Sequence, residues 1–285
     1  MKKKRKKARI FDIWYRLKKN KLAVVSLVVL ILLYLMAIFA PVIAPHSYSE
    51  QNTKRTFEGS SAEYLLGTDK LGLDVLSRLL YGARQSLSMG LIAVAIAATI
   101  GVTLGAVAGF FGRWVDNLCM RFLDIYQSLP MFLLAITLAA ILGPSLRNAI
   151  LALGISTMPI YARIMRAAVL TVREKEYIEA AKAVNARSVR IIIRHIIPNT
   201  MAPIIVEITM GMGATILAGA ALSFIGLGVQ PPNPEWGALI SDARGLIRDH
   251  PTLALYPGVC IMLTSLSFNL LGDGLRDALD PRLKN

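Results

Sequence analysis

The chain is organised as long apolar runs separated by shorter polar segments. Residues 22–40 form nineteen consecutive positions at which Ser26 is the only clearly polar residue. A helix of about 20 apolar residues crosses the roughly 30 Å hydrocarbon core of a bilayer, so this run predicts a membrane span. Five further runs have the same character. The pattern predicts an all-α polytopic membrane protein with six transmembrane helices, at residues 22–44, 86–109, 115–141, 149–170, 201–225 and 253–271.

Prolines and polar segments set the expected limits of these spans. The first run is too long for a cleavable signal and is followed by Pro41, so we expect it to be retained as an anchor. Pro130 and Pro159 are expected to break the third and fourth spans, which membrane helices tolerate when neighbouring groups satisfy the freed carbonyls. The remaining segments are a basic N-terminus at 1–21, long loops at 45–85 and 226–252, and a charged insert at 171–200.

The basic residues are distributed unevenly, and this predicts the orientation. The chain has 32 Lys and Arg against 18 Asp and Glu, a formal net charge of +14. With the N-terminus inside, 24 of the 32 fall on cytoplasmic segments: eleven before residue 22, two at the inner end of the third span, eight within 163–194 and three in the tail. Basic residues concentrate on the cytoplasmic side of membrane proteins. We therefore expect both termini and the insert to be cytoplasmic, and the loops at 45–85 and 226–252 to be outside.

This charge requires no nucleic-acid partner. The basic run at residues 2–7 could serve as a nucleic-acid arm. Beside a membrane span, however, such a run is typical of a topology signal that also binds anionic lipid. The lipid bilayer, and not nucleic acid, is the partner that this segment predicts.

The charged insert predicts a two-helix hairpin. Residues 174–184 favour helix, with apolar residues on one stripe and Glu or Lys on the other faces. Asn185 follows where the chain has to turn, and Asn is the best non-Gly residue for the positive φ that ends a helix there. Ser188 is expected to cap a second helix that stops before Pro198.

One face of this expected second helix is basic, because Arg187, Arg190 and Arg194 recur at helical spacing. One interpretation is a solvated face near lipid headgroups. The other is a docking surface for a cytoplasmic protein. The residues by themselves leave both interpretations open.

The insert resembles the cytoplasmic coupling loop of ABC importer permeases. That loop has the pattern Glu-Ala-Ala, three residues, Gly, nine residues, Ile-x-Leu-Pro. The match consists of Glu179, Ala180, Ala181 and, at the expected distance, Pro198. The departures are Asn185 at the Gly position, and His195 and Ile197 at the Ile and Leu positions.

The resemblance covers nearly the whole chain and points to one branch of the family. Residues 16–23, 66–84, 221–232, 236–237 and 268–282 resemble, in order, segments of the dipeptide/oligopeptide/nickel branch of binding-protein-dependent ABC permeases. Leu73 stands where that family usually carries Arg. Five ordered matches are far more specific than one Glu-Ala-Ala match.

The resemblance implies a permease subunit in a bacterial or archaeal cytoplasmic membrane. It implies a second, homologous permease subunit in a heterodimer, two cytoplasmic ABC ATPase subunits that bind ATP-Mg, and an extracytoplasmic substrate-binding protein. The chain itself would bind no cofactor. Di- or oligopeptides are the first expected substrate, and nickel or a nickel chelate is the alternative. A passive channel or a scaffold protein is the alternative from another class, and neither would need a coupling loop.

The sequence argues against an enzyme. It contains no Gly-x-x-x-x-Gly-Lys-Ser/Thr loop that could cradle ATP phosphates. His46, His195 and His250 are too scattered to predict a metal site or a catalytic pair. Cys119 and Cys260 lie in or beside apolar runs without a CxxC partner, so we expect buried free thiols. We therefore predict no catalytic residue and no metal ligand.

Small and polar residues inside the spans carry further information. Gly101, Gly105 and Gly109 form a ridge at four-residue spacing that lets helices approach closely in lipid. The acids and bases of the third span, at 116–127, are expected to pair with one another or to lie at the interface. Glu207 lies well inside the fifth span, where a carboxylate facing lipid would cost a few kcal/mol. Glu207 is therefore a candidate for the translocation path, and a structural hydrogen bond is the competing interpretation.

Overall fold

The computed structural model describes residues 14–280, and this part of the chain is almost entirely helical. The elements are α2 (Lys21–Ile43), α3 (Val75–Phe111), α4 (Arg113–Tyr126), α5 (Met131–Leu142), α6 (Leu146–Leu170), α7 (Glu176–Ala183), α8 (Ser188–Ile191), the π-helical turn η1 (Ile192–Ile196), α9 (Ile197–Phe224), α10 (Trp236–Ala243), the 3₁₀ turn η2 (Arg244–Leu246) and α11 (Thr252–Leu279). Within residues 14–280 there is no strand, only one isolated bridge between Thr68 and Asp74. The all-α prediction is confirmed.

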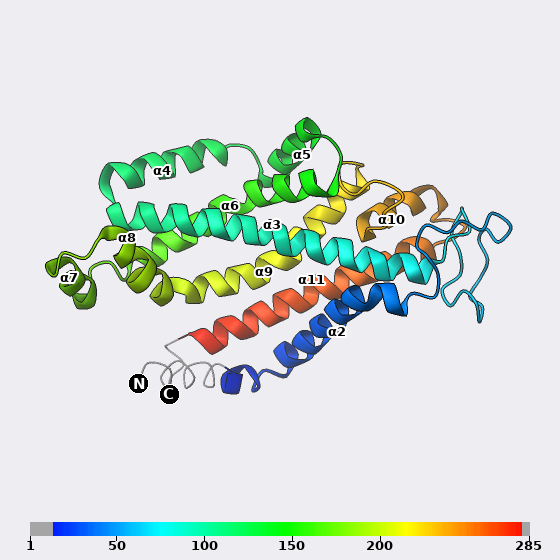
Figure 1. Ribbon diagram of the computed structural model, residues 1–285, viewed down its shortest axis with the longest axis horizontal. Helices are drawn as coiled ribbons and strands as arrows, with labels where there is room; N and C mark the ends of the chain where they lie inside the picture. The colour runs from blue at the N-terminus through cyan, green and yellow to red at the C-terminus, as the bar shows by residue number, and fades with distance from the viewer. Residues whose placement is uncertain (1–13, 281–285) are drawn as a thin grey trace.

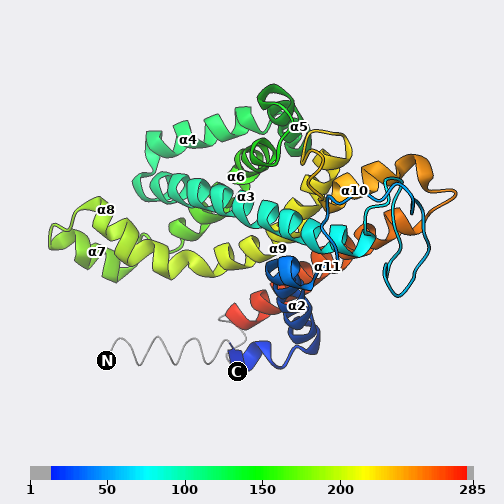
Figure 2. The ribbon, with the colours of Figure 1, turned by 45° about the vertical axis from the view of Figure 1, so that its right-hand side comes forward.

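The long helices run back and forth along an elongated bundle (Figure 1). Among residues 14–280, five helices are long and apolar enough to cross a membrane: α2, α3, α6, the continuous helix Ser188–Phe224, and α11. A sixth span is possible if α4 and α5, which meet at 77°, are counted together. The polytopic fold class is thereby confirmed. In the view turned by 45°, α2 and α11 lie together on one side of α3, with α4 on the other (Figure 2).

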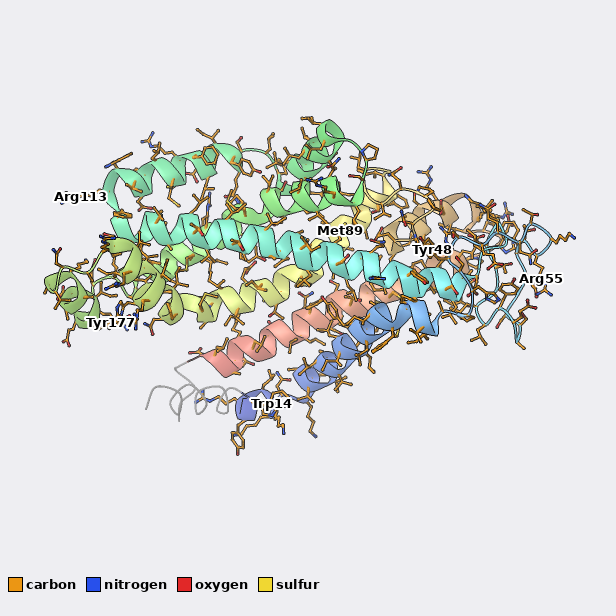
Figure 3. All side chains as sticks on the ribbon, viewed as in Figure 1. Trp14, Tyr48, Arg55, Met89, Arg113 and Tyr177 are labelled. Carbon is orange, nitrogen blue, oxygen red and sulfur yellow. The ribbon has the colours of Figure 1, made fainter. Side chains whose placement is uncertain are left out.

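The two ends of the bundle carry different elements. One end, here called the α7 end, holds α7, α8, the start of α4 and the C-terminal end of α11 (Figure 1). The opposite end, the α10 end, holds α10 and the loop between α2 and α3. Tyr177 and Arg55 mark these two ends (Figure 3). The basic run at 2–7 and the last basic residues of the tail lie outside the described residues.

The second long helix begins earlier than the hydropathy pattern predicts. It starts at Val75 instead of residue 86, so the loop before it is shorter than 45–85. Asp74 caps this helix by accepting a hydrogen bond from the Ser77 backbone N–H at 3.0 Å. The hydropathy pattern does not include these first turns in a span, because they contain the charged residue Arg78. In the structure Arg78 is buried, and its charge is paired with Asp69 at 2.5 Å.

The two prolines expected to break spans behave differently. Pro130 does mark a break: α4 ends at Tyr126, α5 begins at Met131, and Pro130 is the cap residue of α5. Pro159, by contrast, lies inside an uninterrupted α6, so the predicted break there is wrong. Pro159 is buried in the bundle, a setting in which membrane helices retain proline without unwinding.

The predicted glycine ridge forms the closest helix contact, between α3 and α6. A Cβ on Gly101 would lie 2.6 Å from the Met158 carbonyl oxygen, and one on Gly109 would lie 2.8 Å from the Val169 Cβ. A Cβ on Gly105 would overlap the Ala162 carbonyl oxygen. The three glycines therefore allow backbone-to-backbone approach along this face of α3.

The short helix α10 is fastened to the α10 end by buried contacts. Trp236 is fully buried, and its indole N–H donates to the Leu79 carbonyl oxygen at 3.2 Å. Glu235, also fully buried, accepts a hydrogen bond from Ser86 Oγ at 2.6 Å. At the rim, Arg78 reaches Asp242 at 3.3 Å. These contacts fix α10 against α3.

Candidate functional site

The hairpin at the α7 end has the turn that the sequence predicts. Asn185 adopts φ 55°, one of few non-glycine residues with positive φ in the described part of the chain. The Ala186 N–H donates to the Ala181 carbonyl oxygen at 3.1 Å, and the Asn185 N–H donates to the Lys182 carbonyl oxygen at 2.9 Å. This pair of bonds is a Schellman motif, which ends a helix through one left-handed residue. The expected positive φ is confirmed.

The second half of the hairpin differs from the expectation. Ser188 is the first residue of α8 and not its cap; the cap residue is Arg187, with no side-chain capping bond. The helix does not stop before Pro198 but continues through η1 into α9. Pro198 has no N–H to donate, and the turn before it is widened, with the Ile197 N–H bonded to the Ile192 carbonyl oxygen. A π-helical turn thus carries the chain past the proline.

Apolar residues anchor the hairpin on the membrane bundle. Ile178 of α7 is fully buried, as is Ile196 of η1, and both belong to a cluster with Met165 and Val169 of α6. Arg173 adds a hydrogen bond from Nη1 to the Gly109 carbonyl oxygen at 3.2 Å. A force applied to the hairpin would therefore reach α3, α6 and α9 directly.

The outward surface of the hairpin mixes charge with exposed apolar side chains. Among the predicted site residues, Glu179, Ala180, Asn185, Arg187, Arg190, Arg194 and Pro198 are exposed, and Ala181 is half-buried against the hairpin core. No ion pair within residues 14–280 involves the three arginines or Glu179. Val189 and Ile193, beside the arginines, are 65% and 62% exposed. Apolar and arginine side chains together are typical of protein interfaces.

Glu207 lies about midway along the bundle on α9. Its side chain is half-buried and lines a cavity of about 70 Å³ between α5, α6 and α9. The cavity wall is otherwise mostly apolar, with Tyr161 and Ser156 among its polar members. Arg276, distant in sequence on α11, interacts electrostatically with Glu207. The sequence analysis did not predict a base near Glu207, because no residue close to Glu207 in the sequence indicates that α11 brings Arg276 there.

The acids of α4 pair with arginines of α6. The sequence analysis expected the acids and bases of residues 116–127 to pair with one another or to lie at the interface, and it did not predict these partners. Both carboxylate oxygens of Asp116 accept bonds from Arg166, at 2.5 and 2.6 Å. Asp124 accepts a bond from Arg163 at 2.7 Å. These two ion pairs connect α4 to the half of α6 that the sequence analysis predicts to face the cytoplasm. The spacing of the charged residues along α4 does not indicate that their partners lie on α6.

The described residues offer no clustered metal ligands. Within residues 14–280, no three or more His, Cys, Asp and Glu side chains gather as a metal site would require. Cys119 and Cys260 are both free and half-buried. The described residues therefore offer two features of interest, an exposed charged hairpin at the α7 end and a mostly apolar cavity beside Glu207.

Two family models match the chain. Residues 101–285 match the binding-protein-dependent transport system inner membrane component. Residues 10–59 match the N-terminal TM domain of oligopeptide transport permease C. Together they extend over both ends of the sequence, including the hairpin and Glu207.

Similar proteins of known name are transport permeases. The chain is 51% identical to the dipeptide transport system permease protein DppC of Alkalihalophilus pseudofirmus over 270 residues, covering 95% of this chain and 89% of that protein. It is 44% identical to the di/tripeptide transport system permease protein DppC of Pseudomonas aeruginosa, covering 96% and 92%. It is 42% identical to the glutathione transport system permease protein GsiD of Escherichia coli O1:K1 / APEC, covering 96% and 90%.

The fold is shared with a solved transporter. An inward-facing structure of the MetNI methionine ABC transporter superposes with a TM-score of 0.59 at 18% identity, covering 72% of this chain and 97% of the matched chain. At that identity the likeness concerns the fold alone. The full-length sequence matches decide the family: this chain belongs to the inner-membrane components of binding-protein-dependent transport systems, the permease subunits of ABC importers.

Proposed function

We propose that this chain forms half of the translocation path of an ATP-driven importer of di- or oligopeptides. The observation that carries the substrate class is the similarity, over more than nine-tenths of this chain, to permeases named for dipeptides and for di- and tripeptides. Glutathione, for which other relatives are named, is itself a tripeptide. All these substrates share a small peptide backbone with charged ends.

The size of the cavity supports a second permease subunit as a partner. The space that Glu207 lines holds about 70 Å³, whereas pockets that enclose a small ligand usually measure roughly 300–1,000 Å³. The cavity at Glu207 therefore does not enclose a peptide by itself. We propose that a homologous subunit in a heterodimer faces the α5–α6–α9 side and completes the path.

The hairpin is the proposed docking site for an ABC ATPase, one on each permease subunit. Glu179, Ala180 and Ala181 begin the pattern that resembles a coupling loop, and Val189 and Ile193 expose apolar surface beside the arginines. That mixture supports protein docking over a merely solvated basic face. ATP-Mg would bind to those partners, and their closure would move α3, α6 and α9 through the hairpin. A substrate-binding protein would deliver peptide at the α10 end.

Reconstitution of the assembled transporter tests this function. Proteoliposomes that contain this chain, its partner permease and the ATPases should take up a labelled dipeptide only when ATP and the binding protein are both present. Uptake that needs neither would instead indicate a passive channel. ATP-dependent uptake of nickel or a nickel chelate without peptide uptake would overturn the proposed substrate class.

The proposed orientation places the α7 end in the cytoplasm, with both termini. It rests on the excess of Lys and Arg over the segments that meet at that end. A reporter inserted after Ala186 is expected to behave as cytoplasmic, and one inserted near Glu58 as external. Enzymatic reporters that are active on only one side of the membrane provide the measurement. An external signal at Ala186, or a cytoplasmic signal at Glu58, would invert the orientation.

A further inference from the structure

The break between α4 and α5 leaves polar groups inside the bundle without partners. The two helices stop on either side of residues 127–130 and meet at 77°. Two side-chain atoms at the end of α4, the Tyr126 hydroxyl and Gln127 Oε1, are buried and have no hydrogen-bond partner. Buried polar atoms are almost always satisfied in proteins, so this pair requires an explanation.

A third unsatisfied group lies beside Tyr126, on α6. Ser156 is 2% exposed, its Oγ has no hydrogen-bond partner, and it lines the same cavity as Glu207. The Tyr126 hydroxyl lies close to Ser156, although not in hydrogen-bonding geometry. The neighbouring Thr157 is satisfied within its own helix, because its hydroxyl donates to the Leu153 carbonyl oxygen at 2.8 Å. Ser156 thus has a free hydroxyl where Thr157 does not.

The cavity combines the Ser156 hydroxyl with one carboxylate, that of Glu207, and an apolar wall. Glu207 has no hydrogen bond to another side chain within residues 14–280, and Arg276 is the base that interacts with it. The apolar wall comes from Met131, Phe132, Ala135, Leu153, Ile160, Ala214 and Ala218. A volume of about 70 Å³ admits the end of a molecule and not a whole peptide.

We propose that Ser156 and Glu207, with the Tyr126 hydroxyl beside Ser156, form a recognition site for a primary ammonium group, the α-amino end of a peptide in transit. This inference rests on the proposed peptide-import function and adds the part of the substrate that is recognised. An ammonium carries three N–H donors and no acceptor. The site offers a matching set of acceptors: a carboxylate and two hydroxyl oxygens. The apolar wall receives the carbon atoms next to the ammonium.

Transport of two matched peptides tests the proposal. One is a dipeptide with a free α-amino group, and the other carries a hydroxyl in place of that amino group. Transport of each peptide by the complete transporter is measured with the binding protein at a saturating concentration. The transport rate of each variant is then divided by the wild-type rate for the same peptide. This ratio removes differences in capture, because the binding protein is unchanged.

Ser156→Ala and Glu207→Gln are expected to slow the amino peptide by about tenfold and the hydroxyl analogue by less than about twofold. Thr157→Val is the matched control, since it removes a hydroxyl from the same cavity that is already bonded within α6; it should change neither rate by more than about twofold. Equal losses for both peptides, or no loss for either, would overturn the ammonium site while peptide import stands. Absence of peptide transport by the wild type would overturn the proposed function as well.

A second measurement needs no transport. In a complex whose Cys119 and Cys260 are replaced by Ala, Thr157→Cys places a thiol on the cavity wall. An ammonium-bearing thiosulfonate reagent is expected to modify it about tenfold faster than a neutral one, after correction for their reactivity with a free thiol. Adding Glu207→Gln should remove that preference. Equal modification rates with Glu207 present would show that the cavity does not select an ammonium.

Discussion

Replacing Glu179 by Arg is expected to lower ATP-driven transport by about 30-fold or more. Glu179 is exposed on α7 and has no ion pair within residues 14–280, so its charge is available to a partner. Loss of a hot-spot residue of a protein interface costs about 2 kcal/mol or more, which corresponds to roughly 30-fold in a binding constant. The measurement is peptide uptake by the reconstituted transporter, with co-purification of the ATPases monitored in parallel.

The matched control is Glu176→Arg. Glu176 and Glu179 both lie in the first turn of α7 and both are exposed, so the two variants lose the same favourable interaction with the helix dipole. Glu176 lies outside the Glu-Ala-Ala pattern, and its reversal should leave most of the transport rate. Wild-type transport by an assembled Glu179→Arg complex would contradict the docking role. Equal losses in both variants would show that only the net charge of α7 matters.

The structure also shows why Glu179 is a better probe than Ala181. Ala181 is half-buried and packs, together with Ala186, against the cluster that anchors the hairpin. A carboxylate at Ala181 would disturb the hairpin itself, because it would place a charge against apolar neighbours. Loss of transport in Ala181→Asp would therefore not distinguish docking from local unfolding.

Features with a local physical cause could be predicted from the sequence. The apolar runs located the long helices, because a bilayer rewards about 20 successive apolar residues regardless of their neighbours. The need for a positive φ was visible at Asn185, since the helix-forming pattern ended there. The glycine ridge of α3 was visible in its four-residue spacing, and the structure places it against α6.

Features that depend on a distant partner could not be predicted in the same way. The first turns of α3 contain Arg78, which is paired with Asp69 and Asp242, and the sequence gives no sign of these partners. The acids of α4 find Arg163 and Arg166 on α6, some 40 to 50 residues away, with nothing in the spacing of α4 to indicate it. The break at Pro130 was expected, but the unsatisfied groups beside it appear only when α4 and α6 are placed together.

Replacing Gly105 by Ala is expected to destabilise the protein, although alanine usually favours a helix. A Cβ at Gly105 would overlap the Ala162 carbonyl oxygen and lie 2.9 Å from the Met165 Cβ. The first obstacle is backbone, so no side-chain rotation relieves it, and α3 and α6 have to separate. Overpacking of this kind costs roughly 1–3 kcal/mol, which corresponds to about 3–10 °C in the melting temperature of a chain near this size.

Gly258→Ala supplies the comparison that isolates this contact. Gly258 is also a helical glycine in an apolar span, α11, and no atom lies within 4 Å of an added Cβ there. Alanine should therefore leave stability unchanged or raise it slightly through its better helix propensity, by up to about 1 kcal/mol. Thermal unfolding of the two detergent-purified variants gives the answer. If Gly105→Ala melts at or above the temperature of Gly258→Ala, α3 and α6 do not approach through the ridge, and a larger Gly105→Leu variant should then also accumulate normally instead of failing to fold.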